Sequence, residues 1–201
     1  MSGLVTLLGA GPGDAELLTL KGKRRLQEAD VLVFDRLVNQ ELFQQLKSDC
    51  EKIDVGKKPG QPCIRQEEIE KILIEKARQG KRVVRLKSGD PYIFGRGGEE
   101  GVKLVEAGVD FEVVPGITSA VAGLTYAGIP MTYRDVATSF HVFTAHLKDE
   151  TEMLNWEAIS KLKGTLVFLM GMKNLPTIVQ ELTARGYGKD KPAAIVEWGT
   201  H

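Results

Sequence analysis

The chain has 201 residues, of which 27 are Lys or Arg and 27 are Asp or Glu, so its formal net charge is zero. This balance argues against proteins that bind nucleic acid or a membrane surface through bulk positive charge. A composition of 42% hydrophobic and 27% charged residues is typical of a globular protein with one large domain or two small ones.

Cysteine and histidine usage excludes two further classes of protein. Cys50 and Cys63 are too few for a disulfide framework or a cysteine zinc site, and we expect both to be reduced. The histidines show no metal-ligand spacing, so no metal is expected. No apolar run approaches the ~18 residues of a membrane span. The N-terminus lacks the pattern of a secretory signal, so a cytoplasmic location is expected.

Short apolar runs alternate with amphipathic stretches in the first half of the chain. Strands are expected at residues 4–8, 31–34, before 55, at 82–86 and at 111–114. Helices are expected at 17–28, 66–78 and 99–107. Continuously apolar strands between helices indicate a parallel sheet covered on both faces. The sequence therefore predicts an α/β fold that begins with a mainly parallel five-stranded sheet.

The second half predicts another, smaller α/β unit. Helices are expected at 118–127, 156–161 and 175–185, and strands at 139–144, 165–170 and 193–196. The dipeptide Pro115-Gly116 separates the halves, so we expect domains at 1–116 and 117–201. Because the chain ends just after the last expected strand, we expect a second sheet that is mixed and incomplete, and a chain that is a fragment.

A glycine-rich turn, residues 9–14 (Gly-Ala-Gly-Pro-Gly-Asp), follows the first strand. Such a turn lets a ligand approach the backbone closely. A dinucleotide fingerprint is disfavoured because Asp14 stands where helix packing wants glycine and would repel a pyrophosphate, and Pro12 removes a backbone donor. The sequence also lacks a G-x-x-x-x-G-K-[ST] phosphate loop. We therefore expect a ligand-facing turn for a ligand without phosphate, with a merely structural turn as the alternative.

Two more glycine-bearing loops follow strands. Residues 85–97 combine Gly, Asp, Pro and aromatic residues, which offers backbone donors, a carboxylate and an apolar wall. Residues 115–120 place two hydroxyl side chains, Thr118 and Ser119, at the start of a helix. Each loop alone is explained by capping and turn chemistry. Three such turns after strands favour a binding site.

The motifs of the whole chain resemble the tetrapyrrole methylase family of S-adenosylmethionine-dependent enzymes, also called class III methyltransferases. Residues 85–97 are the most diagnostic, and the first turn alone is a weak signal. The other matching segments are residues 9–14, 33–38, 55–57, 114–119, 128–130, 169–171 and 196–200.

This resemblance implies a two-domain homodimer that binds the methyl donor, S-adenosyl-L-methionine, between its domains. It implies C-methylation of uroporphyrinogen III to precorrin-2, by two successive methyl transfers, in sirohaem or cobalamin biosynthesis. The product of the donor would be S-adenosyl-L-homocysteine. By motif, the donor-binding residues would be Pro12, Ser88, Gly89, Asp90, Ile93, Thr118, Ser119, Met170 and Gly199.

The resemblance also assigns the proton chemistry. Asp35 would accept a proton from the macrocycle and Lys57 would donate one, and both follow expected strands at the ligand-binding edge of a sheet. The plain alternatives are a helix or turn cap for Asp35, a solvated charge for Lys57 and a core side chain for Met170. A polycarboxylate substrate needs cations, and the expected partners are Arg36, Lys58, Arg96 and Arg134.

Two residues depart from the family pattern: Ser88 replaces a glycine before Gly-Asp-Pro, and Tyr133 replaces a common histidine. Both bear on substrate positioning rather than on the chemistry. The open alternatives are a methylase for a later corrin intermediate, for diphthine or for ribosomal RNA, and a donor-binding module without catalysis. The zero net charge counts against RNA, and Asp14 with Pro12 disfavours a nicotinamide oxidoreductase.

Overall fold

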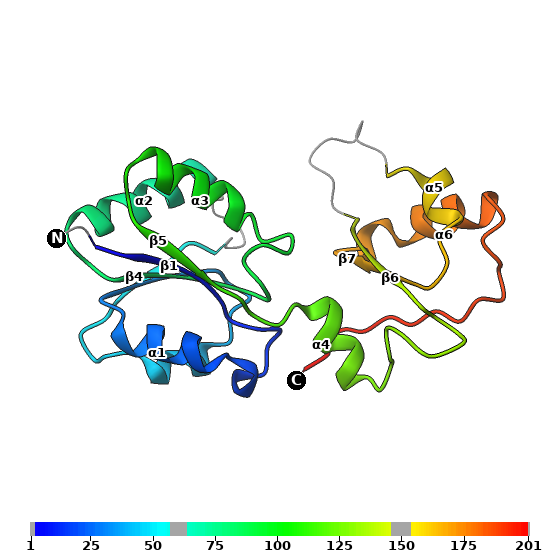
Figure 1. The fold of residues 1–201 in the computed structure, drawn as a ribbon, viewed down its shortest axis with the longest axis horizontal. Coiled ribbons are helices and arrows are strands. Elements are labelled where there is room, and N and C mark those ends of the chain that lie inside the picture. Colours follow the sequence, from blue (N-terminus) through cyan, green and yellow to red (C-terminus); the bar gives the residue numbers. More distant parts are fainter. Residues whose placement is uncertain (1–2, 57–63, 146–153, 201) are drawn as a thin grey trace. The chain divides into compact units, whose positions relative to one another are not determined.

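The structure is a computed structural model that describes residues 3–56, 64–145 and 154–200. The chain forms two compact units, one of residues 1–122 with 198–201 and one of residues 123–197 (Figure 1). The units part inside the helix α4 (Ser119–Tyr126), whereas the sequence placed the boundary before it, at 116/117. Residues 198–201 also return to the first unit.

The first unit is built on a five-stranded sheet in the order β3-β2-β4-β1-β5. The strands are β1 (Val5–Gly9), β2 (Val31–Phe34), β3 (Glu51–Asp54), β4 (Val83–Lys87) and β5 (Phe111–Val114). All neighbouring pairs are parallel. The predicted parallel sheet is therefore confirmed, and β2 and β5 have the predicted bounds.

Helices cover both faces of this sheet. Figure 1 shows α2 (Gln66–Arg78) and α3 (Gly97–Glu106) on one face and α1 (Leu20–Glu28) on the other. Successive strand residues point to opposite faces: Leu7 packs in the cluster that holds Leu73 of α2, and Leu8 in the cluster that holds Leu26 of α1. This two-sided burial explains why the strands are continuously apolar.

The helix expected at residues 17–28 is wrong at its start. The structure has a short 3-10 helix, η1 (Ala15–Leu17), and then α1 from Leu20. The Thr19 hydroxyl accepts a hydrogen bond from the Gly22 backbone N–H at 3.0 Å, so Thr19 is the N-cap of α1. A second 3-10 helix, η2 (Gln40–Gln45), follows β2.

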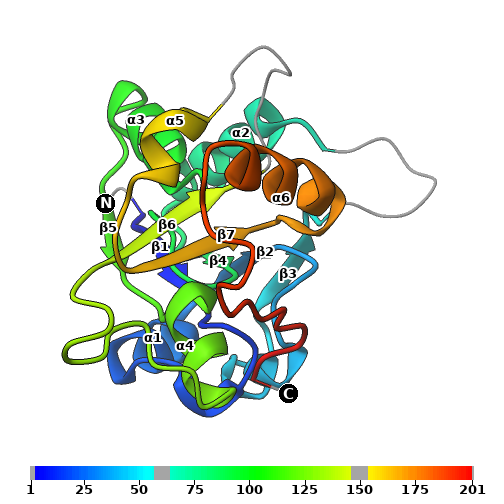
Figure 2. The ribbon, with the colours of Figure 1, turned by 90° about the vertical axis from the view of Figure 1, so that its right-hand side faces the viewer.

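The second unit pairs β6 (Phe140–Thr144) with β7 (Thr165–Leu169) in parallel (Figure 2). Its helices are α5 (Trp156–Ser160) and α6 (Leu175–Ala184), with the 3-10 helix η3 (Met172–Asn174) before α6. The buried side chains of Trp156, Ile159, Ile178 and Leu182 pack with Phe143 and Phe168. These helices supply the apolar cover that a two-stranded sheet needs to be stable.

The strand expected at residues 193–196 is not formed. Ile195 is 62% exposed, and this segment pairs with no strand within the described ranges. Without a neighbouring ladder or a packed apolar face, a β-branched run does not hold a strand. Among the described residues the second sheet is accordingly parallel and two-stranded, rather than mixed. In residues 3–56, 64–145 and 154–200 no helix has the length and apolarity to cross a membrane.

Candidate functional site

The predicted site lies at the carboxyl edge of the first sheet. Because all five strands are parallel, the loops that follow β1, β2, β3, β4 and β5 meet at this edge. Ligands of open α/β sheets bind at the carboxyl ends of their strands. The three glycine-bearing turns and Asp35 all lie in these loops.

Glycines pack the three turns against one another. A Cβ atom on Gly116 would lie 2.2 Å from the Gly89 carbonyl oxygen, and one on Gly9 would lie 2.5 Å from the Gly116 nitrogen. The backbones of Gly11 and Gly89 form an isolated bridge, with N···O distances of 3.2 and 2.7 Å. These glycines therefore allow the loops after β1, β4 and β5 to pack into one surface.

Asp90 ties two of these turns together. Its Oδ1 accepts a hydrogen bond from the Tyr92 backbone N–H at 2.8 Å, and its Oδ2 accepts one from the Gly116 N–H at 3.1 Å. The carboxylate thus organises the loop after β4 and joins it to the turn after β5. Each oxygen keeps a lone pair, so Asp90 retains capacity to accept from a ligand.

The first turn is also fixed by polar contacts. Asp14 accepts a hydrogen bond from the Glu16 N–H at 2.8 Å and caps η1, while its own N–H donates to the Thr200 hydroxyl at 3.2 Å. The Asn39 side chain donates to the Gly13 carbonyl at 2.8 Å. Asp14 therefore caps η1.

The structure brings most of the predicted donor-binding residues into the first unit. Thr118 accepts from the Ala120 N–H at 3.4 Å, at the start of α4, and Ile93 is 44% exposed beside Asp90. The members in this unit are Pro12, Ser88, Gly89, Asp90, Ile93, Thr118, Ser119 and Gly199. Their role in binding a donor stays a prediction.

Met170 belongs to the second unit and directly follows β7. It is 55% exposed, which is against the alternative that it is a plain core side chain. Its φ is 56°, a left-handed conformation that costs energy for a residue with a Cβ atom. Such conformations cluster at functional sites. The role of Met170 in binding the donor stays a prediction.

Asp35 directly follows β2, and its carbonyl accepts a hydrogen bond from the Val38 N–H at 3.2 Å. Its carboxylate receives a hydrogen bond of 2.6 Å from Nη2 of Arg85, a residue of β4. The side chain of Asp35 is 33% exposed. Asp35 is thus an ion-paired carboxylate with partial access to solvent. A residue that only capped a helix or turn would not need this ion pair.

The loop after β3 approaches the Asp35 turn closely. A Cβ atom on Gly56 would lie 2.5 Å from the Arg36 nitrogen, so glycine is required there. Lys57, the predicted proton donor, directly follows Gly56. Lys57 and Lys58 lie outside the described residues, and their predicted roles are untested.

The predicted substrate-binding arginines belong to different elements of the two units. Arg36 is exposed beside Asp35, and Arg96 lies at the start of α3, whereas Arg134 is exposed in the second unit. The Arg96 side chain pairs with Glu99 through contacts of 3.0 and 2.6 Å, and these hydrogen bonds raise its pKa. Arg96 therefore keeps its charge, which Glu99 partly offsets.

A buried charge cluster beneath Asp35 was not found by sequence reasoning. It consists of Asp35, Arg85, Lys87 and Glu100, and the last three are less than 4% exposed. Burial, followed by the charge of Arg85, lowers the pKa of Lys87, although Glu100 and Asp35 act against this. The available signal was the alternation of charged Arg85 and Lys87 with apolar residues in an otherwise buried strand.

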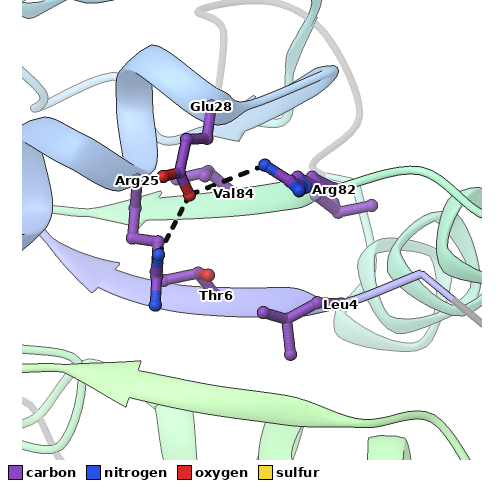
Figure 3. Close-up of a pocket in the computed structure, with 7 residues that line it drawn as sticks. Leu4, Thr6, Arg25, Glu28, Arg82 and Val84 are labelled. Carbon is purple, nitrogen blue, oxygen red and sulfur yellow. Dashed lines mark hydrogen bonds and ion pairs between the residues drawn. The ribbon is translucent and has the colours of Figure 1, made fainter.

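A cavity of about 300 Å³ lies elsewhere, at the amino end of the sheet under α1 (Figure 3). Figure 3 shows Glu28 joined to Arg25 and to Arg82, with contacts of 2.9 and 3.8 Å. Because its charges are paired with one another and it lies at the amino ends of the strands, we do not assign the candidate site to it. The lining residues are Leu4, Thr6, Arg25, Glu28, Arg82, Val83 and Val84.

The sequence of the chain is similar to part of the sequence of siroheme synthases. Siroheme synthase 2 of Klebsiella pneumoniae is 52% identical over 198 residues, which make up 98% of this chain and 43% of that protein. The siroheme synthase of Escherichia coli has the same identity and coverage. The chain therefore spans less than half the length of these relatives.

Solved structures match over a larger share of their length. Native uroporphyrin III C-methyl transferase from Thermus thermophilus is 41% identical with a TM-score of 0.77, covering 92% of this chain and 78% of that one. A structure of the Thermus enzyme complexed with S-adenyl homocysteine has the same identity and TM-score, with coverages of 92% and 73%. The family model of the Tetrapyrrole (Corrin/Porphyrin) Methylases matches residues 4–201. The chain belongs to the tetrapyrrole methylase family.

Proposed function

We propose that this chain transfers methyl groups from S-adenosyl-L-methionine to carbon atoms of uroporphyrinogen III, in two steps, to give precorrin-2. The observation that carries the proposal is Asp35, an ion-paired and partly exposed carboxylate beside the glycine turns of a parallel sheet edge. Support also comes from the 41% identical Thermus protein, which is named a uroporphyrin III C-methyl transferase. The product would enter sirohaem or cobalamin biosynthesis.

The residues of the first unit suit a donor that has hydroxyl and amino groups but no phosphate. Gly89 has a φ of +67°, and the nearest atom to the position of a Cβ on it would be Thr118 Cα, at 3.7 Å. A ligand can therefore come close to the backbone at Gly89. Asp90 offers carboxylate lone pairs for a hydroxyl or ammonium group. When bound, the donor supplies an electrophilic methyl group on sulfur.

The protein's own part in the reaction is positioning and proton transfer. Holding the reactants in line is worth ~7 to 11 kcal/mol in favourable cases. Asp35 accepts the proton that the macrocycle loses when its pyrrole carbon attacks the methyl group, and Lys57 returns one elsewhere. A positioned base contributes about 10²- to 10⁴-fold to the rate.

Cationic side chains would bind the carboxylates of the substrate. Arg36 is exposed next to Asp35, and Arg96 keeps its positive charge at the start of α3. Lys58 and Arg134 complete the proposed set. Arginine suits this task because its planar fork matches a carboxylate.

The active form in this proposal is a cytoplasmic homodimer. Tyr92, Val102 and Val105 are 55%, 57% and 66% exposed in the first unit, and they line an apolar cavity of about 290 Å³. Apolar surface of this kind is a feature of protein interfaces. Light scattering on the purified chain would report twice the monomer mass; a monomer at assay concentration would contradict this part.

Anaerobic incubation with uroporphyrinogen III and S-adenosyl-L-methionine tests the reaction. We expect the absorption spectrum of a dipyrrocorphin to appear, with release of S-adenosyl-L-homocysteine. A chain that binds S-adenosyl-L-homocysteine in calorimetry but methylates no tetrapyrrole would be a binding module. Methylation of a later corrin intermediate instead of uroporphyrinogen III would overturn the substrate.

A further inference from the structure

The buried charge cluster is energetically unfavourable in itself, because removing charged groups from water costs desolvation energy. Arg85 and Lys87 alternate on β4, facing the side of the sheet that α2 and α3 cover. Glu100 is the buried acid of α3 that meets them. Apolar side chains of similar volume would fill this space at least as stably, so the charges indicate a task beyond packing.

Three hydrogen bonds hold the guanidinium of Arg85 in place. Its Nε donates to Glu100 Oε1 at 3.1 Å, its Nη1 to the Leu86 carbonyl at 3.3 Å, and its Nη2 to Asp35 Oδ1 at 2.6 Å. The shortest of these contacts is the one to Asp35. The guanidinium therefore connects Glu100, in the interior of the first unit, to the Asp35 carboxylate at the sheet edge.

The two carboxylates of the cluster, Glu100 and Asp35, both contact Arg85. Glu100 Oε1 accepts from Lys87 Nζ at 3.0 Å as well as from Arg85 Nε, and also from Gln66 at 3.2 Å. Two cations thus share one glutamate oxygen. Asp35 supplies a second carboxylate to the cluster, through its contact with Arg85 Nη2.

We propose that Arg85 is a positioning residue for the reaction, holding Asp35 Oδ1 so that Oδ2 accepts the proton. This inference rests on the proposed function, in which Asp35 is the base. Within the described part of the chain, Oδ2 has no hydrogen-bond partner. Glu100 acts one step further back, because it accepts a hydrogen bond from Arg85 and balances its charge, and Lys87 donates to the same Glu100 oxygen.

A double-mutant cycle separates this role from a purely structural one. We expect Arg85→Gln to lower kcat about 10- to 100-fold, within the range that a positioned base contributes. Its affinity for S-adenosyl-L-homocysteine should stay unchanged. If Arg85 acts through Asp35, Arg85→Gln should cause little further loss of kcat when Asp35→Asn is already present. Losses that multiply in the double variant would overturn the proposal.

Two further variants guard against misfolding and unspecific charge effects. Arg85→Lys keeps a positive charge beside Glu100 but lacks the planar fork, so it should fold and still lose kcat. Arg82→Gln is the matched control, because Arg82 precedes the same strand at its other end and is 64% exposed on its side chain. Its kcat should equal that of the wild type. Full activity of Arg85→Lys would contradict the need for the fork.

The same assay distinguishes failure of the inference from failure of the proposed function. An inactive wild-type chain that still binds S-adenosyl-L-homocysteine would remove the proposed function and this inference with it. Activity that Asp35→Asn abolishes but Arg85→Gln leaves intact would overturn the inference alone.

Discussion

The two edges of the first sheet both carry arginine–carboxylate pairs, but they differ in burial and in what the pairs do. At the amino edge, Arg25 pairs with Glu28 and Glu112 in a partly exposed setting. At the carboxyl edge, Arg85 is 2% exposed and connects a fully buried acid to Asp35. The first arrangement joins α1 to β5, whereas the second presents one carboxylate from a rigid base. The two pairs therefore differ in the burial of the arginine and not in the access to the carboxylate.

The largest expected effect is at the carboxyl edge. Asp35→Ala should reduce turnover about 10²- to 10⁴-fold, because the base is lost while the turns stay in place. Calorimetry should give an unchanged affinity for S-adenosyl-L-homocysteine. If that affinity collapsed as well, Asp35 would be a binding or folding residue.

Asp90 tests whether the loop ties matter for the donor. Asp90→Ala removes two hydrogen bonds to backbone N–H groups and should weaken S-adenosyl-L-homocysteine binding about 10- to 100-fold. Asp110→Ala, at an exposed aspartate just before β5, serves as the matched control. Equal affinities of the two variants, measured by calorimetry, would remove Asp90 from the donor site.

The close packing of the glycine turns at the carboxyl edge can be tested through the free energy of unfolding. Gly116→Ala places a Cβ atom 2.2 Å from the Gly89 carbonyl, so the turns must shift, at a cost of about 1–3 kcal/mol in the free energy of unfolding. Gly98→Ala is the control, because nothing lies within 4 Å of its Cβ position. Urea denaturation of both variants measures the difference. Equal midpoints would show that the turns are not in tight contact.

The smallest effect is expected at the amino edge. Burial opposes ionisation of Glu112, but hydrogen bonds from Arg25 and Lys21 outweigh it and hold the pKa of Glu112 at about 2. A lowered pKa stabilises the fold above the unfolded-state value of 4.5, and this contribution disappears as the pH falls toward 2. Glu112→Gln should therefore cost on the order of 1 kcal/mol at neutral pH and less in acid. A difference in unfolding free energy that grew as the pH fell would contradict this sign.

Sequence patterns predicted the strands and turns of the carboxyl edge, but not the buried charge cluster beneath Asp35. The bounds of α2, β2 and β5 follow directly from hydrophobic periodicity, and the glycine turns follow from their place after strands. The pairing of Arg85 with Glu100 joins different elements, and no local pattern reveals which helix will cover β4. The strand predicted at residues 193–196 is not formed. Strand propensity is a local property, but a strand also requires a neighbouring strand to pair with.

The comparison of edges is tested most directly by making the same chemical change at each. Asp35→Asn and Glu112→Gln both replace a carboxylate by an amide next to an arginine. Under anaerobic conditions, with uroporphyrinogen III and S-adenosyl-L-methionine, the first-turnover rate of each variant is compared with the wild type. We predict a loss of about 10²-fold or more for Asp35→Asn and a rate near that of the wild type for Glu112→Gln. Equal rates for the two variants would contradict the assignment of the chemistry to the carboxyl edge.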